Sequence, residues 1–129
     1  MARGEQRLAG RYPCYRVYEC ADRRYYSVAA LEPMFWQALC EALEHPELVE
    51  FQLSEDAGAH RAVEEIFRTR SRDDWQQVLA RADACSEPVL DLDEVSRHPQ
   101  IAARNLFEKR GRAPRLGEHT EEILREIGL

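Results

Sequence analysis

Apolar and polar residues alternate over two short stretches near the start of the chain. In residues 15–20, Tyr, Val and Glu fall on one side of an extended chain and Arg, Tyr and Cys on the other, and several of these residues favour strands. A second stretch, residues 25–30, follows after the polar residues 21–24. The pattern predicts an antiparallel hairpin, and we expect residues 28–30 of its second strand to be buried.

Helical spacing replaces the alternation after residue 32. Pro33 suits the first position of a helix, and the apolar residues up to Leu43 fall on one face, so we predict a helix over residues 33–44. His45-Pro46 ends it. Further helices are predicted over residues 46–52 and 99–104, and another is predicted to end near residue 68. The capping patterns of Ser71 with Asp74 and of Asp91 with Glu94 predict the starts of two more. A last helix is predicted from a cap at Thr120 to a stop at Gly128.

These elements together predict an α+β fold, in which a small antiparallel β-hairpin or sheet packs with several short helices. Residues 84–90 are mostly apolar, but Pro88 excludes a central strand, so we expect an edge strand there. Trp36 and Trp75 are the largest apolar side chains on the inward faces of their helices. We therefore expect both indoles to lie in the core.

Length and composition limit the domain organisation. A chain of 129 residues corresponds to one domain, large enough for a core but too small for a nucleotide-binding sheet with a second domain. With 44% hydrophobic and 33% charged residues, it has the composition of a soluble globular protein. We expect the polar residues 1–11 to be a flexible lead-in, and we expect neither a signal peptide nor a membrane partner. A cytoplasmic location is the expectation.

The cysteines and histidines show no spacing that is typical of a metal or catalytic site. Cys14, Cys20, Cys40 and Cys85 have neither C-x-x-C spacing nor a paired histidine, so we expect no metal and buried, reduced thiols. His60 has no paired Ser, Cys or Asp motif, and we expect it to face solvent. The net charge of −6 argues against nucleic acid as a partner, because phosphate binding needs a basic surface.

Glu32 lies where the second strand meets the helix that begins at Pro33, with core-forming residues on both sides. One interpretation is structural, because a carboxylate before a helix is favoured by the unpaired N–H groups and by the helix dipole. The other is catalytic: a general acid or base, tuned by partial burial, that faces a cleft from the strand-to-helix turn. The residues alone leave both interpretations open.

Five blocks of sequence, in order, carry a resemblance to a known family. They are residues 15–36, which contain the Leu-Glu-Pro-x-Phe-Trp core, and residues 67–75, 82–94, 98–99 and 116–128. These blocks resemble the small domain of the class III CoA-transferase and α-methylacyl-CoA racemase family. Family members usually have glycine after the aspartate of the hairpin turn, where this chain has Arg23, which indicates either another turn type or a strained turn.

The resemblance implies an interlocked homodimer that acts on CoA thioesters, with the thioester as substrate and no covalently bound cofactor. In this family the active site lies between the large Rossmann-like domain of one chain and the small domain of the other. The racemase branch uses an Asp on one face of the α-carbon and a His with a Glu on the other, and only the Glu has a counterpart here, at Glu32. The Asp, the His and most of the CoA pocket belong to the large domain, so the resemblance assigns no cofactor-binding residue in this chain.

The same resemblance suggests domain limits and a branch. Residues 12–107 would form the small domain, and residues 108–129 a basic loop and C-terminal helix on a connection that is shorter than in relatives. The transferase branch tends to carry a glycine-rich loop in its small domain. This chain has none, so the racemase-like branch is favoured.

Three hypotheses of function remain open. The chain is a small-domain part of an acyl-CoA racemase or CoA-transferase, a subunit of a split enzyme whose partner chain supplies the large domain, or a non-catalytic interaction or oligomerisation module derived from the family. Whether the chain itself is an enzyme is left open, since it lacks the large-domain Asp and His. We also expect a homo-oligomer, because Ile123, Leu124, Ile127 and the outer face of the hairpin would lack the cover of a large domain.

Overall fold

The computed structural model describes residues 6–107 and 112–129. The first five residues of the predicted lead-in, and residues 108–111 of the predicted basic loop, lie outside the described residues. The chain forms two compact units, Met1–Leu90 and Asp91–Leu129.

The first unit is built on a three-stranded antiparallel sheet. Its strands are β1 (Tyr15–Glu19), β2 (Tyr25–Ala29) and β3 (Ser86–Pro88), in the order β1-β2-β3. Tyr18 pairs with Tyr26 across the first ladder, and Tyr26 pairs with Pro88 across the second. The predicted hairpin, the edge position of the third strand and the α+β fold are confirmed.

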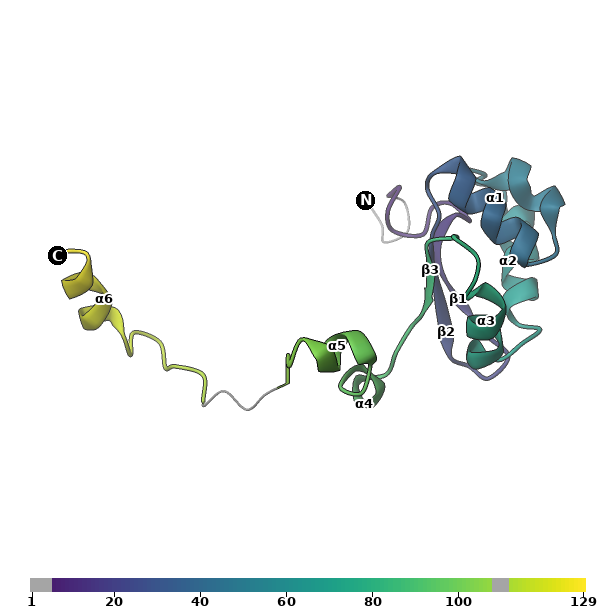
Figure 1. Ribbon diagram of the computed structural model, residues 1–129. Coiled ribbons are helices and arrows are strands. Elements are labelled where there is room, and N and C mark those ends of the chain that lie inside the picture. Colours follow the sequence, from purple (N-terminus) through teal and green to yellow (C-terminus); the bar gives the residue numbers. More distant parts are fainter. Residues whose placement is uncertain (1–5, 108–111) are drawn as a thin grey trace. The chain divides into compact units, whose positions relative to one another are not determined.

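Helices cover one face of this sheet, as Figure 1 shows for α1, α2 and α3. In chain order, the helical elements of this unit are α1 (Pro33–Ala42), the 3₁₀ helix η1 (Pro46–Phe51), α2 (Ala57–Phe67) and α3 (Arg72–Leu79). Asp56 begins α2, where its side chain accepts hydrogen bonds from the N–H groups of Gly58 and Ala59. Ser71 begins α3 in the same way, because its hydroxyl accepts from the N–H of Asp74. The Ser71 cap lies where the sequence pattern placed a helix start, whereas the sequence analysis assigned no start to the helix that Asp56 begins.

Alternation along the strands decides which side chains enter the core. Tyr18, Tyr26 and Val28 point inward and are buried, whereas Val17 and Tyr25 are exposed on the opposite face. The prediction that all of residues 28–30 are buried is wrong at residue 29, which is exposed. Successive side chains of a strand point to opposite faces, and only one face of this sheet is covered by the helices of its unit.

The hairpin turn keeps a backbone conformation that usually belongs to glycine. Arg23 has φ = 64°, and the turn is closed by hydrogen bonds from Cys20 N to Arg24 O and from Arg23 N to Cys20 O. Asp22 supports the turn by accepting a hydrogen bond from Arg24 N at 3.2 Å. The left-handed conformation costs a residue with a Cβ roughly 1–2 kcal/mol. Of the two sequence-based alternatives, the structure therefore shows the strained one.

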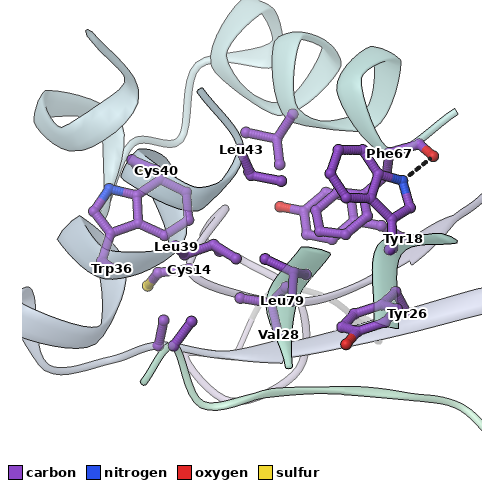
Figure 2. Packing of buried hydrophobic residues seen from close by; sticks show 14 of the residues in the cluster. Cys14, Tyr18, Tyr26, Val28, Trp36, Leu39, Cys40, Leu43, Phe67 and Leu79 are labelled. Carbon is purple, nitrogen blue, oxygen red and sulfur yellow. Dashed lines mark hydrogen bonds between the residues drawn. The ribbon is translucent and has the colours of Figure 1, made fainter. Parts of the chain in front are cut away.

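The core lies between the sheet and the three helices. Trp36 and Trp75 are both buried, as predicted. Figure 2 shows Tyr18, Tyr26 and Phe67 at one end of the core and Trp36 at the other. The rings of Tyr18 and Phe67 stack with their centroids 4.8 Å apart, and Trp75 Nε1 donates to the carbonyl of Phe67 at 2.8 Å. Each indole N–H thus has a partner inside the core.

In the second unit, the described residues form helices but no buried core. It contains α4 (Leu92–Val95), α5 (Pro99–Ala103) and α6 (Thr120–Glu126). The predicted Asp91–Glu94 capping box begins α4, and Gly128, at φ = 79°, follows the end of α6. Thr120 was predicted to cap α6 but is its first helical residue, since the N-cap is His119. None of the residues described between 91 and 129 is buried.

Among the helices that the structure describes, none combines the length and apolar character that crossing a membrane would need.

Candidate functional site

Glu32 is the N-cap residue of α1 and lies one residue before Pro33, the first residue of the helix. Its backbone is extended, with φ = −77° and ψ = 137°, and its carbonyl accepts the N–H groups of Phe35 and Trp36 at 3.1 and 3.2 Å. Its side chain makes no capping hydrogen bond. The structural interpretation is therefore not realised as a hydrogen-bonded cap, whereas a carboxylate at this position still interacts favourably with the helix dipole.

The carboxylate of Glu32 faces solvent instead of being partly buried as the catalytic interpretation expected. The residue leaves the sheet at the corner where β2 ends, and the following Met34 is also exposed, at 65%. Within the described residues, no hydrogen bond or ion pair engages this carboxylate. In this chain, Glu32 is an unengaged carboxylate at a defined backbone position.

The backbone before Glu32 is held from several sides. Ala30 N donates to Cys14 O at 2.8 Å, and Ala29 N donates to Cys85 O at 2.9 Å. Gln52 contributes from the segment after η1, because its Nε2 donates to the carbonyls of Ala30 and Leu31 at 3.2 and 2.9 Å. The sequence analysis placed Gln52 at the end of the helix predicted over residues 46–52 but did not identify it as part of the site, because its contacts with residues 30 and 31 lie far away in the sequence.

Cys85 is the second residue near Glu32 that the sequence analysis did not identify as part of the site. The expectation of buried thiols holds for Cys14, Cys20 and Cys40 but is wrong for Cys85, which is exposed and has φ = 45°. Incomplete solvation, with the nearby charges of Asp83 and Glu32, raises the pKa of the Cys85 thiol above its usual value. The thiol is therefore mainly neutral near pH 7.

A hollow of about 400 Å³ borders β3 and the loop that carries Cys85. Its lining includes Tyr26, Asp83, Cys85, Ser86 and Glu87. The two carboxylates make this hollow a poor site for the phosphates of CoA, because like charges repel. Glu32 is not among the residues that line it.

The histidines of the first unit have partners of their own. His60 was expected to face solvent, but it is half-buried, and its Nδ1 lies 2.8 Å from Nη1 of Arg16. Because a guanidinium can only donate, Nδ1 is the acceptor of this hydrogen bond. The same arginine forms an ion pair with Glu64 at 2.9 Å. His60 therefore belongs to a link between β1 and α2.

Metal ligands do not gather in the parts of the chain that the structure describes, residues 6–107 and 112–129, where no group of three His, Cys, Asp or Glu side chains could hold an ion. Over the same residues, the site has one unengaged carboxylate, Glu32, and one neutral thiol, Cys85, on a fixed strand-to-helix link. Such a set can supply one side of an acid/base reaction at most.

Comparison with known proteins finds relatives among α-methylacyl-CoA racemases and CoA-transferases. Over 98% of its length the chain is 32% identical to the α-methylacyl-CoA racemase of Homo sapiens, of which it spans 40%. Over 79% of its length it is also 32% identical to a CaiB/baiF CoA-transferase family protein of Caenorhabditis elegans, of which it spans 29%. The fold matches the crystal structure of Rv3272 from Mycobacterium tuberculosis with a TM-score of 0.59 and 23% identity, over 75% of this chain and 30% of that one.

The chain thus spans about two fifths or less of the relatives it matches. Its alignment with the human racemase extends over 153 positions, more than the 129 residues of the chain, so the alignment contains gaps. The family model of CoA-transferase family III matches residues 1–120, which is nearly the whole sequence. This chain belongs to CoA-transferase family III.

Proposed function

We propose that this chain is the small-domain part of an enzyme that acts on acyl-CoA thioesters, and that it completes an active site with a large Rossmann-like domain. The observation that carries the proposal is Glu32 in the Leu-Glu-Pro-x-Phe-Trp sequence. It is exposed, its side chain makes no capping hydrogen bond, and its backbone is held in place. Family membership and the partial span of the relatives support the same reading.

Within the family we favour the racemase-like branch. The α-methylacyl-CoA racemase of Homo sapiens is matched over 98% of this chain, whereas the acetyl-CoA:oxalate CoA-transferase of Acetobacter aceti is matched over 81% at 28% identity. The substrate proposed on this basis is a 2-methylacyl-CoA thioester. The reaction proposed is exchange of the proton on its α-carbon.

The chemistry of α-proton exchange explains why the chain would need a partner. A thioester α-carbon is a weak acid, so exchange requires a base on one face, an acid on the other, and donors that stabilise the enolate between them. A single positioned acid or base contributes only about 10²- to 10⁴-fold. Glu32 would be one such group, and the large domain would supply the opposing groups and the donors.

The exposure of Glu32 is consistent with this division. A reacting carboxylate has to work in a site from which water is excluded. In the chain described here the carboxylate faces solvent, so under the proposal its cover comes from the large domain. The partner domain is either joined to this chain or supplied by a separate chain, as in a split enzyme.

The test is α-proton exchange in deuterated water, followed as a mass shift of 2-methylacyl-CoA. The wild-type chain and Glu32→Gln are each measured alone and with a large domain of the family. Glu50→Gln is the matched control, because Glu50 is exposed on η1 and within the described residues has no hydrogen-bond partner. We expect no exchange by any chain alone, and exchange in the complex for wild type and Glu50→Gln only.

Two results would contradict the proposal. Exchange by the isolated wild-type chain would show that the large domain is not needed. Full activity of Glu32→Gln in the complex would remove the role proposed for Glu32.

A second candidate function is supported by the second unit. Its apolar side chains are exposed, including Leu116 at 108%, Ile123 at 53% and Ile127 at 64%. Exposed apolar residues in such number mark an interface, so a non-catalytic interaction or oligomerisation module is the alternative. Sedimentation of the wild-type chain against Ile123→Ser/Ile127→Ser tests it. Association of the wild type that is lost in the variant, together with a complex that stays active with Glu32→Gln, would favour this alternative.

A further inference from the structure

The link between β2 and α1 contains two carbonyls that neither element uses. The strand ends at Ala29 and the helix begins at Pro33, so the carbonyls of Ala30 and Leu31 lie beyond the β2–β1 ladder. Both accept hydrogen bonds from the side-chain amide of Gln52, at 3.2 and 2.9 Å. Because both partners are acceptors only, the amide nitrogen and not its oxygen has to face them.

Gln52 is itself held against α1. It directly follows η1, whose Leu48 is buried. Trp36 Nε1, from α1, donates to the carbonyls of Leu48 and Val49 at 3.1 and 3.2 Å. The segment η1 is thus bound to the helix through Trp36 and to the preceding link through Gln52. Glu32 lies between these two attachments.

The contact with Leu31 matters most for the direction of Glu32. The carbonyl of Leu31 and the N–H of Glu32 belong to one planar peptide unit, so fixing that carbonyl fixes the plane from which Glu32 departs. The carboxylate is attached to this backbone through rotatable single bonds and has no capping contact to fix it. The backbone position is therefore what the described part of this chain contributes to the placement of the carboxylate.

We propose that Gln52 is the positioning residue of Glu32, acting through the carbonyls of Ala30 and Leu31. The inference rests on the proposed function, because it assigns Gln52 a part in placing the carboxylate that exchanges the α-proton. Gln52 itself does not touch the reacting atoms. A displacement of about 1 Å in a reacting group can cost about 100-fold in rate, so loss of this amide should lower turnover.

The test uses this chain with a large domain of the family. Gln52→Met keeps the length of the side chain and removes both donors, whereas Gln52→Arg returns N–H donors at a similar distance from the backbone. Gln37→Met is the matched control, since Gln37 is exposed on α1 and its amide donates only to Glu41 among the described residues. We expect Gln52→Met to lower kcat about 10- to 100-fold with KM nearly unchanged, Gln52→Arg to restore part of it, and Gln37→Met to have no effect.

A double-mutant cycle separates positioning from simple destabilisation. If Gln52 acts through Glu32, then Gln52→Met has a smaller effect on kcat in the Glu32→Asp background, in which the shorter side chain has already displaced the carboxylate. If Gln52→Met lowers kcat equally in the wild-type background and in the Glu32→Asp variant, the inference is overturned. It is also overturned if Gln52→Met is fully active while Glu32→Gln is inactive. Full activity of Glu32→Gln would instead refute the proposed function and leave no carboxylate to position.

A measurement on the isolated chain decides the matter if the complex cannot be formed. Scalar couplings across hydrogen bonds, measured by NMR, should connect the Gln52 side-chain nitrogen with the carbonyl carbons of Ala30 and Leu31. Gln52→Met should increase backbone motion at residues 30–32 and leave the signals of Trp75 unchanged. An unchanged link in this variant would overturn the inference.

Discussion

Replacing Trp36 tests how the core holds the segment that carries the candidate site. The side chain is 0% exposed, so Trp36→Ala removes a fully buried indole, which costs about 3–5 kcal/mol in comparable cores. The substitution also leaves the buried carbonyl of Leu48 without its donor, a further cost of about 1–3 kcal/mol. We expect the sum, about 4–8 kcal/mol, to remove a large part of the stability of a domain of this size, which is typically about 5–15 kcal/mol.

Trp36→Phe separates the two contributions. Phenylalanine keeps much of the buried apolar area but cannot donate to Leu48 and Val49, so we expect a loss of about 1–3 kcal/mol, most of it from the missing hydrogen bonds. The control is Met34→Ala on the same helix, since Met34 is 65% exposed and its loss should change stability by less than about 0.5 kcal/mol.

Urea unfolding measured by far-UV circular dichroism gives these free energies without depending on the fluorescence of the residue that is replaced. A Trp36→Phe variant as stable as wild type would refute the assignment of the indole N–H to the η1 carbonyls. A Trp36→Ala variant that loses less than about 1 kcal/mol would refute the placement of Trp36 in the core.

Two further predictions concern groups with raised pKa values, the first the buried Tyr26 and Cys40 and the second the exposed thiol of Cys85. Burial raises the pKa of Tyr26 from 10.0 to about 12 and that of Cys40 from 9.0 to about 12, so the folded chain holds these protons where the unfolded chain has released them. Their contribution to stability should therefore be complete below pH 9 and be lost as pH rises from 9 to 12. The midpoint of urea unfolding should fall over this pH range. The fall should be less steep for Tyr26→Phe than for the control Tyr25→Phe at an exposed site. In the folded chain a maleimide should label Cys85 before the buried cysteines, slowly near pH 7 because its thiol pKa is raised, and Asp83→Asn should speed the reaction. Labelling of Cys40 at an equal rate, or no effect of Asp83→Asn, would contradict this.

Much of the fold could be predicted because its elements depend on local patterns. Alternation marks β1 and β2, Pro33 marks the start of α1, and the Ser71–Asp74 pair marks the start of α3. Both indoles could be placed in the core because each lies on the apolar face of an amphipathic helix, where burial is strongly favoured. Local patterns therefore carry most of the information about this α+β unit.

The errors arise where burial depends on residues far away in the sequence. Residue 29 is apolar but lies on the uncovered face of the sheet, and His60 is polar but meets Arg16, which is 44 residues away in the chain. Cys85 is apolar but exposed in the loop before β3, where its backbone is left-handed. Sequence periodicity reports the faces of an element but not what packs against each face.

The candidate site shows the same limit most clearly. The Leu-Glu-Pro-x-Phe-Trp sequence placed Glu32 at a strand-to-helix link. The structure shows that link held by Gln52, whose side-chain contacts with residues 30 and 31 no local pattern predicts. The expected partial burial of Glu32 is not found, because no residue described in its own unit covers it. Under the proposed function, Gln52 and the backbone around Glu32 supply the direction of the carboxylate, and the large domain supplies the exclusion of water. The part of the site that depends on backbone geometry would then lie within this chain, and the part that depends on burial would lie with its partner.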